Sequence, residues 1–298
     1  MEQNKSNYIK GIMLTILGAI AWGFSGTCGQ YLMNIKNINP QYVVTLRLLF
    51  SGLILISITL FKNKKKSFRI FKNKRDTLRL FIFAIFGMTS CQYSFLVAIH
   101  YTNAPTTTVI QFLSSIFIVI GMCIIEKRLP RKVEIFAIIF AVIGTFALTT
   151  HFSLDRLVIT PLGLFWGLVA AFAVVIYTLT PIKILQKYSS IVVNGFGMFL
   201  GGILLTILVR PWTYSYSFDI MTFLSLAAII LIGTVFAFTA FLHGVSIIGP
   251  VKGSLIAGLE AISALVFSII LLGETFSPID LLGMAMILFA VSILSFDK

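Results

Sequence analysis

A carboxylate stands inside one of the most apolar stretches of the chain. Glu260 lies in GSLIAGLEAISALVFSIILLGE, residues 253–274, where every other side chain before Glu274 is uncharged. Because an ionised side chain at the centre of a membrane-crossing helix costs about 2.5–3.5 kcal/mol, such a residue is a candidate for chemistry. Glu260 either binds a proton or a substrate amine in a water-filled cavity, or hydrogen-bonds a neighbouring helix and fixes the packing. The sequence alone slightly favours the packing role.

Two basic residues are the other charged candidates. Lys252 precedes Glu260 by eight residues, which on a helix is about 12 Å along the axis and about 80° around it. A direct pair between them is therefore not expected. Lys252 can attract an anionic group such as a carboxylate at the cytoplasmic mouth, or can extend to the membrane interface. For Arg47, inside another apolar run, we expect a gate or a structural pair rather than substrate contact.

A stripe of polar side chains gives a third set of candidates. Thr107, Gln111 and Ser115 are spaced four residues apart and would share one face of a helix. Such residues hydrogen-bond between helices or line a cavity, and their number on one stripe favours the cavity. The same cavity role is expected of Trp22, Gln30, Gln92, Tyr93, Tyr177 and His243, with packing as the alternative for the lone Trp and His side chains.

The elements that must position these residues are long apolar segments. The chain of 298 residues is 58% hydrophobic and only 11% charged, so it has too few polar residues to cover a soluble surface. Helices of about 20 residues satisfy every backbone polar group within the hydrocarbon core. We therefore predict an all-α membrane protein with ten transmembrane helices, at residues 11–33, 40–61, 79–100, 104–125, 133–150, 160–183, 188–209, 220–243, 249–273 and 278–296.

The positive charge predicts orientation rather than a nucleic-acid partner. The net charge is +13, but the basic residues form short runs between the apolar segments. With ten spans, the termini and the loops on their side hold 18 of the 23 Lys and Arg residues. Because cytoplasmic loops are rich in Lys and Arg, we expect a multi-pass protein of the cell membrane with both termini in the cytoplasm.

The two halves of the chain resemble each other. Three features recur at nearly one spacing: Trp22 and Trp166, Pro105 and Pro250, and the E-x-x-x-P motifs at Glu126 and Glu274. They define two five-helix repeats, residues 11–150 and 160–296. Because five is an odd number, the second repeat would enter the membrane from the opposite side. Inverted repeats of this kind occur in secondary transporters, which bind substrate between the halves.

These residues also carry a resemblance to a known family. The Trp-Gly pairs ending at Gly23 and Gly167, Arg47 in VVTLRLLFSGLIL, the YTNAPTTTVIQFLSSIF stretch and the Glu260 segment together resemble EamA-type carriers of the drug/metabolite transporter superfamily. The chain departs from the family pattern at Ala261 and Ser115, where the family usually has Pro. The resemblance implies ten helices, a central cavity and export of small metabolites such as amino acids.

Several classes of function lack their motifs. The sequence has no Walker A pattern, no H-E-x-x-H and no G-x-S-x-G, so no cofactor is expected and ATP is not expected to drive transport. We predict a secondary active transporter working by alternating access in the lipid bilayer, with a small-molecule substrate and protons as a candidate coupling ion. The alternative is an integral-membrane enzyme using His151, Asp155 and Arg156. The oligomeric state is not predicted.

Overall fold

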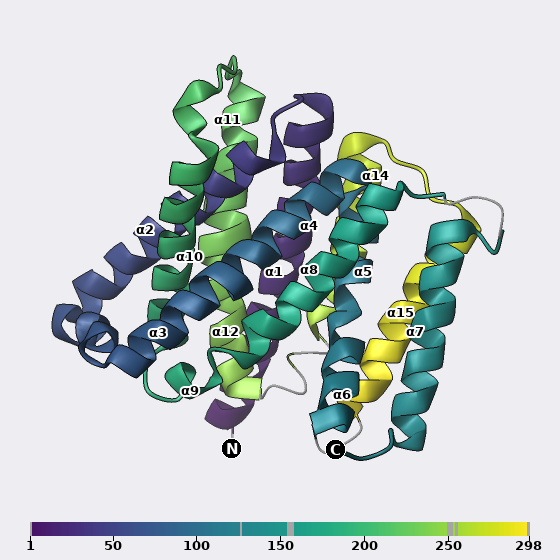
Figure 1. The fold of residues 1–298 in the computed structure, drawn as a ribbon, viewed down its shortest axis with the longest axis horizontal. Coiled ribbons are helices and arrows are strands. Elements are labelled where there is room, and N and C mark those ends of the chain that lie inside the picture. The colour runs from purple at the N-terminus through teal and green to yellow at the C-terminus, as the bar shows by residue number, and fades with distance from the viewer. Residues whose placement is uncertain (1, 126, 154–157, 249–252, 254–255, 297–298) are drawn as a thin grey trace.

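The computed structural model describes residues 2–125, 127–153, 158–248, 253 and 256–296, and within them it contains helices but no strand (Figure 1). The first half holds α1 (Glu2–Gln30), η1 (Tyr31–Ile35), α2 (Pro40–Ser67), η2 (Phe68–Lys72), α3 (Lys74–Ile82), η3 (Phe83–Thr89), α4 (Ser90–Tyr101), α5 (Ala104–Phe112), α6 (Ser114–Ile125) and α7 (Lys132–Thr150). The second half holds α8 (Pro161–Leu179), α9 (Ile182–Leu185), α10 (Ser190–Val209), η4 (Pro211–Thr213), α11 (Ile220–Ala227), η5 (Ala228–Phe236), α12 (Ala237–Ile248), α14 (Leu259–Leu272) and α15 (Pro278–Phe296).

The described part contains eight helical stretches that are long and apolar enough to cross a membrane. They correspond to the first eight predicted spans and run over Asn7–Ile35, Pro40–Phe61, Lys74–Tyr101, Ala104–Gly121, Lys132–Thr150, Pro161–Leu179, Ser190–Val209 and Ile220–Ile248. Two further apolar stretches, Leu259–Leu272 and Pro278–Ile293, are shorter. The chain is therefore a multi-span helical protein. The starting end of α1 and the final end of α15 lie at the same end of the bundle (Figure 1).

The helices pack mainly in pairs that join the two halves of the chain. α2 lies along α10, α7 along α15, α1 along α12, and α4 along α8. Their apolar side chains form two clusters of buried residues, a larger one centred on α2, α4 and α10 and a smaller one between α5, α7 and α15. The space between the two halves is therefore lined by helices from both.

Glycines allow the closest of these contacts. On α7 and α15, a Cβ added to Gly144 would lie 2.8 Å from the carbonyl oxygen of Gly283, and one added to Gly283 would lie 2.8 Å from that of Gly144. The obstacle is backbone on both sides, and backbone cannot rotate away as a side chain can. The short approach of these two helices therefore requires small residues at both positions.

Gly283→Ala is expected to lower the melting temperature of the purified protein, because the added methyl group forces α15 away from α7. Overpacking of this kind costs about 1–3 kcal/mol. The matched control is Gly121→Ala in α6, where an added Cβ meets nothing within 4 Å. That variant should be neutral or slightly stabilising because Ala is the better helix former. Equal melting temperatures for both variants in a thermal-unfolding experiment would contradict this account of the α7–α15 contact.

Two spans contain π-helical segments at matching positions in the two halves. η3 begins at Phe83 and η5 at Ala228, the same separation along the chain as that of Pro105 and Pro250. In each segment a threonine closes the wider turn: Thr89 Oγ1 donates to the carbonyl of Ala84 at 2.7 Å, and Thr234 Oγ1 donates to that of Ile229 at 2.8 Å. The two threonines therefore hold equivalent positions in the repeats. π-Helical turns interrupt the regular ladder and are frequent at functional sites.

Two other spans are broken, again at equivalent positions. The span predicted at 104–125 is divided at Leu113, between α5 and α6, and the segment predicted at 249–273 has a turn at Gly258 before α14 begins. Residues 249–252 and 254–255 lie outside the described part. Ser115 and Glu260 thus stand at equivalent places, each in the second position after a break. Broken helices place backbone polar groups where a cavity or a ligand can satisfy them.

Candidate functional site

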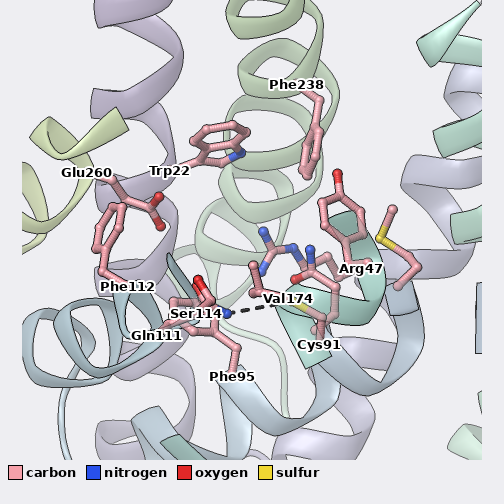
Figure 2. A pocket seen from close by; sticks show the side chains of 13 residues that line it. Trp22, Arg47, Cys91, Phe95, Gln111, Phe112, Ser114, Val174, Phe238 and Glu260 are labelled. Carbon is pink, nitrogen blue, oxygen red and sulfur yellow. Dashed lines mark hydrogen bonds between the residues drawn. The ribbon is translucent and has the colours of Figure 1, made fainter. Parts of the chain in front are cut away.

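A cavity of about 220 Å³ lies between the two halves of the chain. Side chains from α1, α2, η3, α4, α5, α6, α8, α12 and α14 line it: Trp22, Arg47, Met88, Cys91, Gln92, Phe95, Gln111, Phe112, Ser114, Val174, Tyr177, Phe238 and Glu260 (Figure 2). Its wall is mostly apolar and carries a few polar groups, which is the usual composition of a small-molecule site.

Glu260 is the one acidic side chain among the described residues that line the cavity. Its carboxylate is turned towards the inside of the cavity, and no described side chain hydrogen-bonds or ion-pairs with it (Figure 2). The prediction of one uninterrupted helix over 249–273 is wrong: the helix is interrupted at Gly258, and Glu260 lies in the first turn of α14. There the free N–H groups of the helix N-terminus favour a negative charge.

The start of α14 is held by close contact with α1. A Cβ added to Gly23 would meet the Ser263 side chain, the backbone nitrogen of Ala264 and the carbonyl oxygen of Glu260. Ser263 Oγ also donates to that carbonyl oxygen at 3.0 Å. Because α1 touches the backbone of this turn directly, the Glu260 side chain is left to extend into the cavity rather than between the two helices.

Arg47 lines the same cavity from α2 and is only 5% exposed. Its Nε donates a 3.0 Å hydrogen bond to Oγ1 of Thr234, the threonine that closes the π-helical turn of η5. No described carboxylate forms an ion pair with Arg47. A guanidinium has five N–H donors, so one fixes the side chain on the second half and the others remain for the cavity.

The polar stripe enters the cavity differently from the prediction. Gln111 lines it, with Nε2 donating to Cys91 Sγ at 3.6 Å, and the next polar contributor is Ser114 rather than Ser115. Regular four-residue spacing holds only along one continuous helix. The break at Leu113, whose N–H bonds back to the Ile110 carbonyl three residues earlier, changes the register. The expectation that Ser115 lines the cavity is therefore not met here.

Ser114→Val is expected to weaken ligand binding in the cavity by about three- to tenfold, because two methyl groups take the place of the hydroxyl and one polar contact is lost. Ser115→Val is the matched control, since it makes the same change one residue further along and outside the lining. Binding is read as the ligand-induced rise in melting temperature, which follows the dissociation constant. Equal losses in both variants would show that Ser114 has no special contact with the ligand.

Other residues predicted to line the cavity lie elsewhere. Gln30 donates from Nε2 to Glu274 Oε1 at 2.5 Å and accepts at Oε1 from the Ala104 N–H at 2.8 Å, so it joins three spans near one end. The Tyr93 hydroxyl accepts from Gln41 Nε2 at 3.0 Å. Both side chains have hydrogen-bond partners and do not line this cavity.

Of the remaining residues predicted to line the cavity, some do so and others lie elsewhere. Thr107 is fully buried and shares a 2.7 Å hydrogen bond with Thr102, while His243 is exposed on α12. Lys252 lies outside the described residues. Trp22, Gln92 and Tyr177 do line the cavity, and Trp22 packs edge to face against Phe238 with ring centroids 5.1 Å apart.

Several lining residues were not identified from the sequence. On the third span, Met88, Cys91, Gln92 and Phe95 lie at helical spacing and so share one face of the helix. Of these four, only the polar Gln92 was identified from the sequence, although the spacing of the other three placed them on the same face. Phe112 and Phe238 carry no such signal, because 28 Phe residues are spread over the chain and most would be assigned to lipid contact. Only the structure, which places them beside lining residues of other helices, identifies these two Phe residues as part of the cavity wall.

The comparisons with known proteins define a membrane transport protein. The model of the EamA-like transporter family matches residues 9–150 and again residues 161–296, so the chain belongs to this family. The resemblance read from the sequence is thereby confirmed. The membership excludes the enzyme alternative, and Asp155 and Arg156 of its proposed cluster lie outside the described residues. His151 Nε2 instead lies 2.6 Å from Asp280 Oδ1 on α15.

Individual relatives agree with this assignment. An uncharacterized inner membrane transporter, YicL of Salmonella typhimurium, is 35% identical over 97% of this chain and 96% of its own length. The riboflavin transporter ImpX of Fusobacterium nucleatum is 29% identical over 56% of each chain. A protein of known crystal structure shares the fold, with a TM-score of 0.60, 14% identity and coverage of 98% of this chain and 96% of its own. The chain is a multi-pass inner-membrane transport protein.

Proposed function

We propose that this protein is a secondary active carrier that exports small metabolites such as amino acids by alternating access. The observation that carries the proposal is the central cavity. It holds one carboxylate, Glu260, which forms no hydrogen bond or ion pair with another described side chain, and one guanidinium, Arg47, within an otherwise mostly apolar wall. Opposite charges in one small cavity suit a zwitterionic solute, whose amine and carboxylate would each meet a counter-charge. The aromatic rings of Trp22, Phe95 and Phe238 would take its apolar part.

The repeated irregularities support an inverted arrangement of two five-helix repeats, residues 11–150 and 160–296, with ten crossings in all. π-Helical turns begin at Phe83 and Ala228, and breaks occur at Leu113 and Gly258, so both features recur at one and the same separation. An even number of crossings is also in keeping with termini at one end of the bundle (Figure 1). Two near-equivalent halves can exchange conformations, and each exchange opens the opposite side of the cavity.

The coupling ion in this proposal is the proton, carried by Glu260. A carboxylate that forms no hydrogen bond or ion pair with another described side chain can take up a proton in one conformation and release it in another. The basic loops favour a cytoplasmic position for the termini, and with them for the Asp76 end of the bundle. Substrate would then bind from that side and leave at the other as protons enter.

The proposal is tested by transport and binding measurements on the purified protein. A thermal-shift screen against metabolites selects ligands, because a ligand that binds the folded state raises its melting temperature. In proteoliposomes, each selected ligand should show saturable uptake, counterflow and stimulation by a pH gradient. Failure of amino acids, nucleoside-like compounds and amphipathic compounds to move in this assay would overturn the proposed substrate class.

A further inference from the structure

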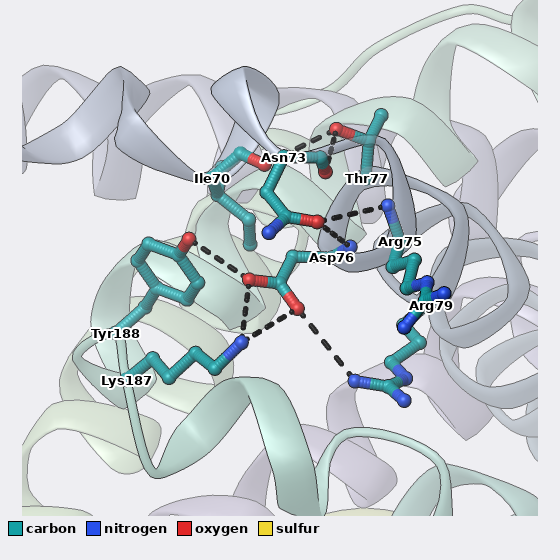
Figure 3. Close-up of polar contacts among 8 residues, drawn as sticks. All are labelled: Ile70, Asn73, Arg75, Asp76, Thr77, Arg79, Lys187 and Tyr188. Atoms are coloured by element: carbon teal, nitrogen blue, oxygen red, sulfur yellow. Dashed lines mark hydrogen bonds and ion pairs between the residues drawn. The ribbon is translucent and has the colours of Figure 1, made fainter.

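Two lysine–aspartate ion pairs join the halves of the chain at opposite ends of the bundle. At one end, Lys36 Nζ lies 2.6 Å from Asp219 Oδ2. At the other, which also carries the start of α1 and the final end of α15, Lys187 Nζ lies 3.0 Å from Asp76 Oδ2 and 3.1 Å from Oδ1 (Figures 1 and 3). Each pair takes its lysine from one half and its aspartate from the other.

The two pairs are built in the same way. Asp219 is the N-cap of α11, and Asp76 lies in the first turn of α3 behind the N-cap Asn73, so each acid begins the third span of its half. The two N-caps, Asn73 and Asp219, are separated by nearly the same length of chain as the other repeated features. Lys36 precedes α2 and Lys187 precedes α10, so each lysine leads into the second span of its half. One device therefore occurs twice, once at each end.

Three of the four spans joined by these pairs line the cavity, and the fourth, α10, packs against one of them. The Lys36–Asp219 pair joins the span of Arg47 to the span of Phe238. The Lys187–Asp76 pair joins α10 to the span that carries Cys91 into the cavity, and α10 in turn packs along α2. A change in either pair therefore reaches the cavity wall through continuous helices.

The pair Lys36–Asp219 also stands at the rim of a second hollow of about 300 Å³, between Ile38 and the segment Tyr216–Phe218. Lys36 holds the pKa of Asp219 well below its usual range through their hydrogen bond. A depressed acid pKa means that the pair weakens only as the pH falls through that low value, so it stays charged between about pH 5 and pH 8. Breaking it requires a movement of the helices and not a physiological change of pH.

We propose that the two ion pairs are the gating contacts of the transport cycle: Lys36–Asp219 closes one mouth of the carrier, Asp76–Lys187 closes the other, and each pair separates when the cavity opens to its own side. This inference rests on the alternating access of the proposed function. Both pairs are formed here, so this conformation is closed by ion pairs at both ends. The Asp76 gate is the firmer, because its carboxylate is 2% exposed and also accepts from the Tyr188 hydroxyl at 3.1 Å.

The test uses Cys91 as a reporter, since its thiol lines the cavity. The chain has three cysteines, and Cys28→Ala with Cys123→Ala leaves Cys91 as the sole thiol. Its rate of labelling by a membrane-impermeant maleimide is measured from each face, in right-side-out and inside-out vesicles. Protease access to an N-terminal tag identifies the face that carries the termini. No substrate is needed, so failure of this test and failure of metabolite transport are distinguishable.

Lys36→Gln should raise labelling about two- to fivefold from the face opposite the termini, the population shift that loss of an exposed ion pair produces. Lys187→Gln should raise it from the termini face instead. Lys36→Arg and Lys187→Arg keep the charge and should label like the parent. Lys183→Gln is the neutral control, because Lys183 is exposed on α9 and forms no ion pair with a described residue.

Opposite directions for the two Gln variants, with both Arg variants unchanged, would establish the gates. Increased labelling from the same face in both variants would overturn the proposal and leave the pairs as structural contacts. Unchanged labelling in both Gln variants would overturn it as well. Melting temperatures are measured for every variant, so that labelling caused by general unfolding is recognised by its appearance from both faces.

Discussion

Glu260→Gln is expected to abolish accumulation driven by a pH gradient while leaving substrate exchange in place. Gln has nearly the shape of Glu and can donate and accept hydrogen bonds, but it cannot bind and release a proton in this range. One pH unit across the membrane stores about 1.4 kcal/mol per proton, which supports an about tenfold solute gradient for one coupled proton. The variant should reach no gradient of this size, whereas counterflow should persist, with a higher half-saturation concentration because the substrate amine loses its counter-charge.

The control for this prediction is another glutamate of the same half. Glu274 accepts the Gln30 hydrogen bond and does not line the cavity. Burial raises the pKa of Glu274, and the Gln30 hydrogen bond opposes the shift. Glu274→Gln keeps a carbonyl oxygen for Gln30, so pH-driven accumulation should persist. Pairs of uptake and counterflow measurements on both variants separate the two roles, and an unchanged pH dependence in folded Glu260→Gln would refute coupling through Glu260.

The ion pair at Asp219 makes this experiment easier to interpret. Because Lys36 holds the pKa of Asp219 below its usual range, this pair keeps its charges over the pH range of the transport assay. A pH dependence seen in the parent and lost in Glu260→Gln therefore cannot come from protonation of this gating contact. It would report on the cavity itself.

The sequence was sufficient for features that depend on local composition. Long apolar runs predict spans because the thickness of the bilayer sets the length of a spanning helix, and because a helix satisfies all of its backbone hydrogen bonds internally. Eight of the ten predicted runs are found at that length in the described part. The polar residues that stand out in such runs were also informative: Glu260, Arg47, Gln111 and Gln92 all line the cavity. Each is a polar or charged residue within an apolar membrane-spanning segment, where such a residue is unusual.

The remaining features depend on contacts between distant segments. The break at Leu113 and the π-helical turn at Thr234 lie within apolar runs whose composition is that of an ordinary spanning helix, so composition does not reveal them. This is why Ser114, and not Ser115, lines the cavity. The pair of Lys36 with Asp219 joins residues 183 positions apart, both in loops that read only as topology signals. The repeat spacing was already present in the sequence. Applied to Asp219, it would have led to the region of Asn73 and so indicated that both residues stand at the start of a helix.

Arg47→Met should weaken binding of carboxylate-bearing ligands by about ten- to a hundredfold, the second large effect expected of the cavity. Arg47 is the one basic side chain among the described residues that line it, and hydrogen bonds to a charged group contribute about 1.5–3 kcal/mol. Amide or ester analogues of the same ligand lack the carboxylate charge, so their affinity should change much less. Binding is measured by ligand-induced thermal shift, with each analogue tested on parent and variant.

A second pair of variants separates the charge of Arg47 from its position. Thr234→Val removes the hydroxyl that holds Arg47 Nε, whereas Thr89→Val removes the matching hydroxyl of η3, which holds no arginine. Both lose the hydrogen bond that closes a π-helical turn, and Thr234→Val also loses the one from Arg47, so Thr234→Val should be destabilised at least as much as Thr89→Val. Only Thr234→Val should also weaken carboxylate binding, by about three- to tenfold, since the guanidinium keeps its charge but loses its anchor. Equal binding by the two variants would mean that Arg47 is positioned by packing alone, and that the π-helical turn of η5 serves the fold of its span rather than the cavity.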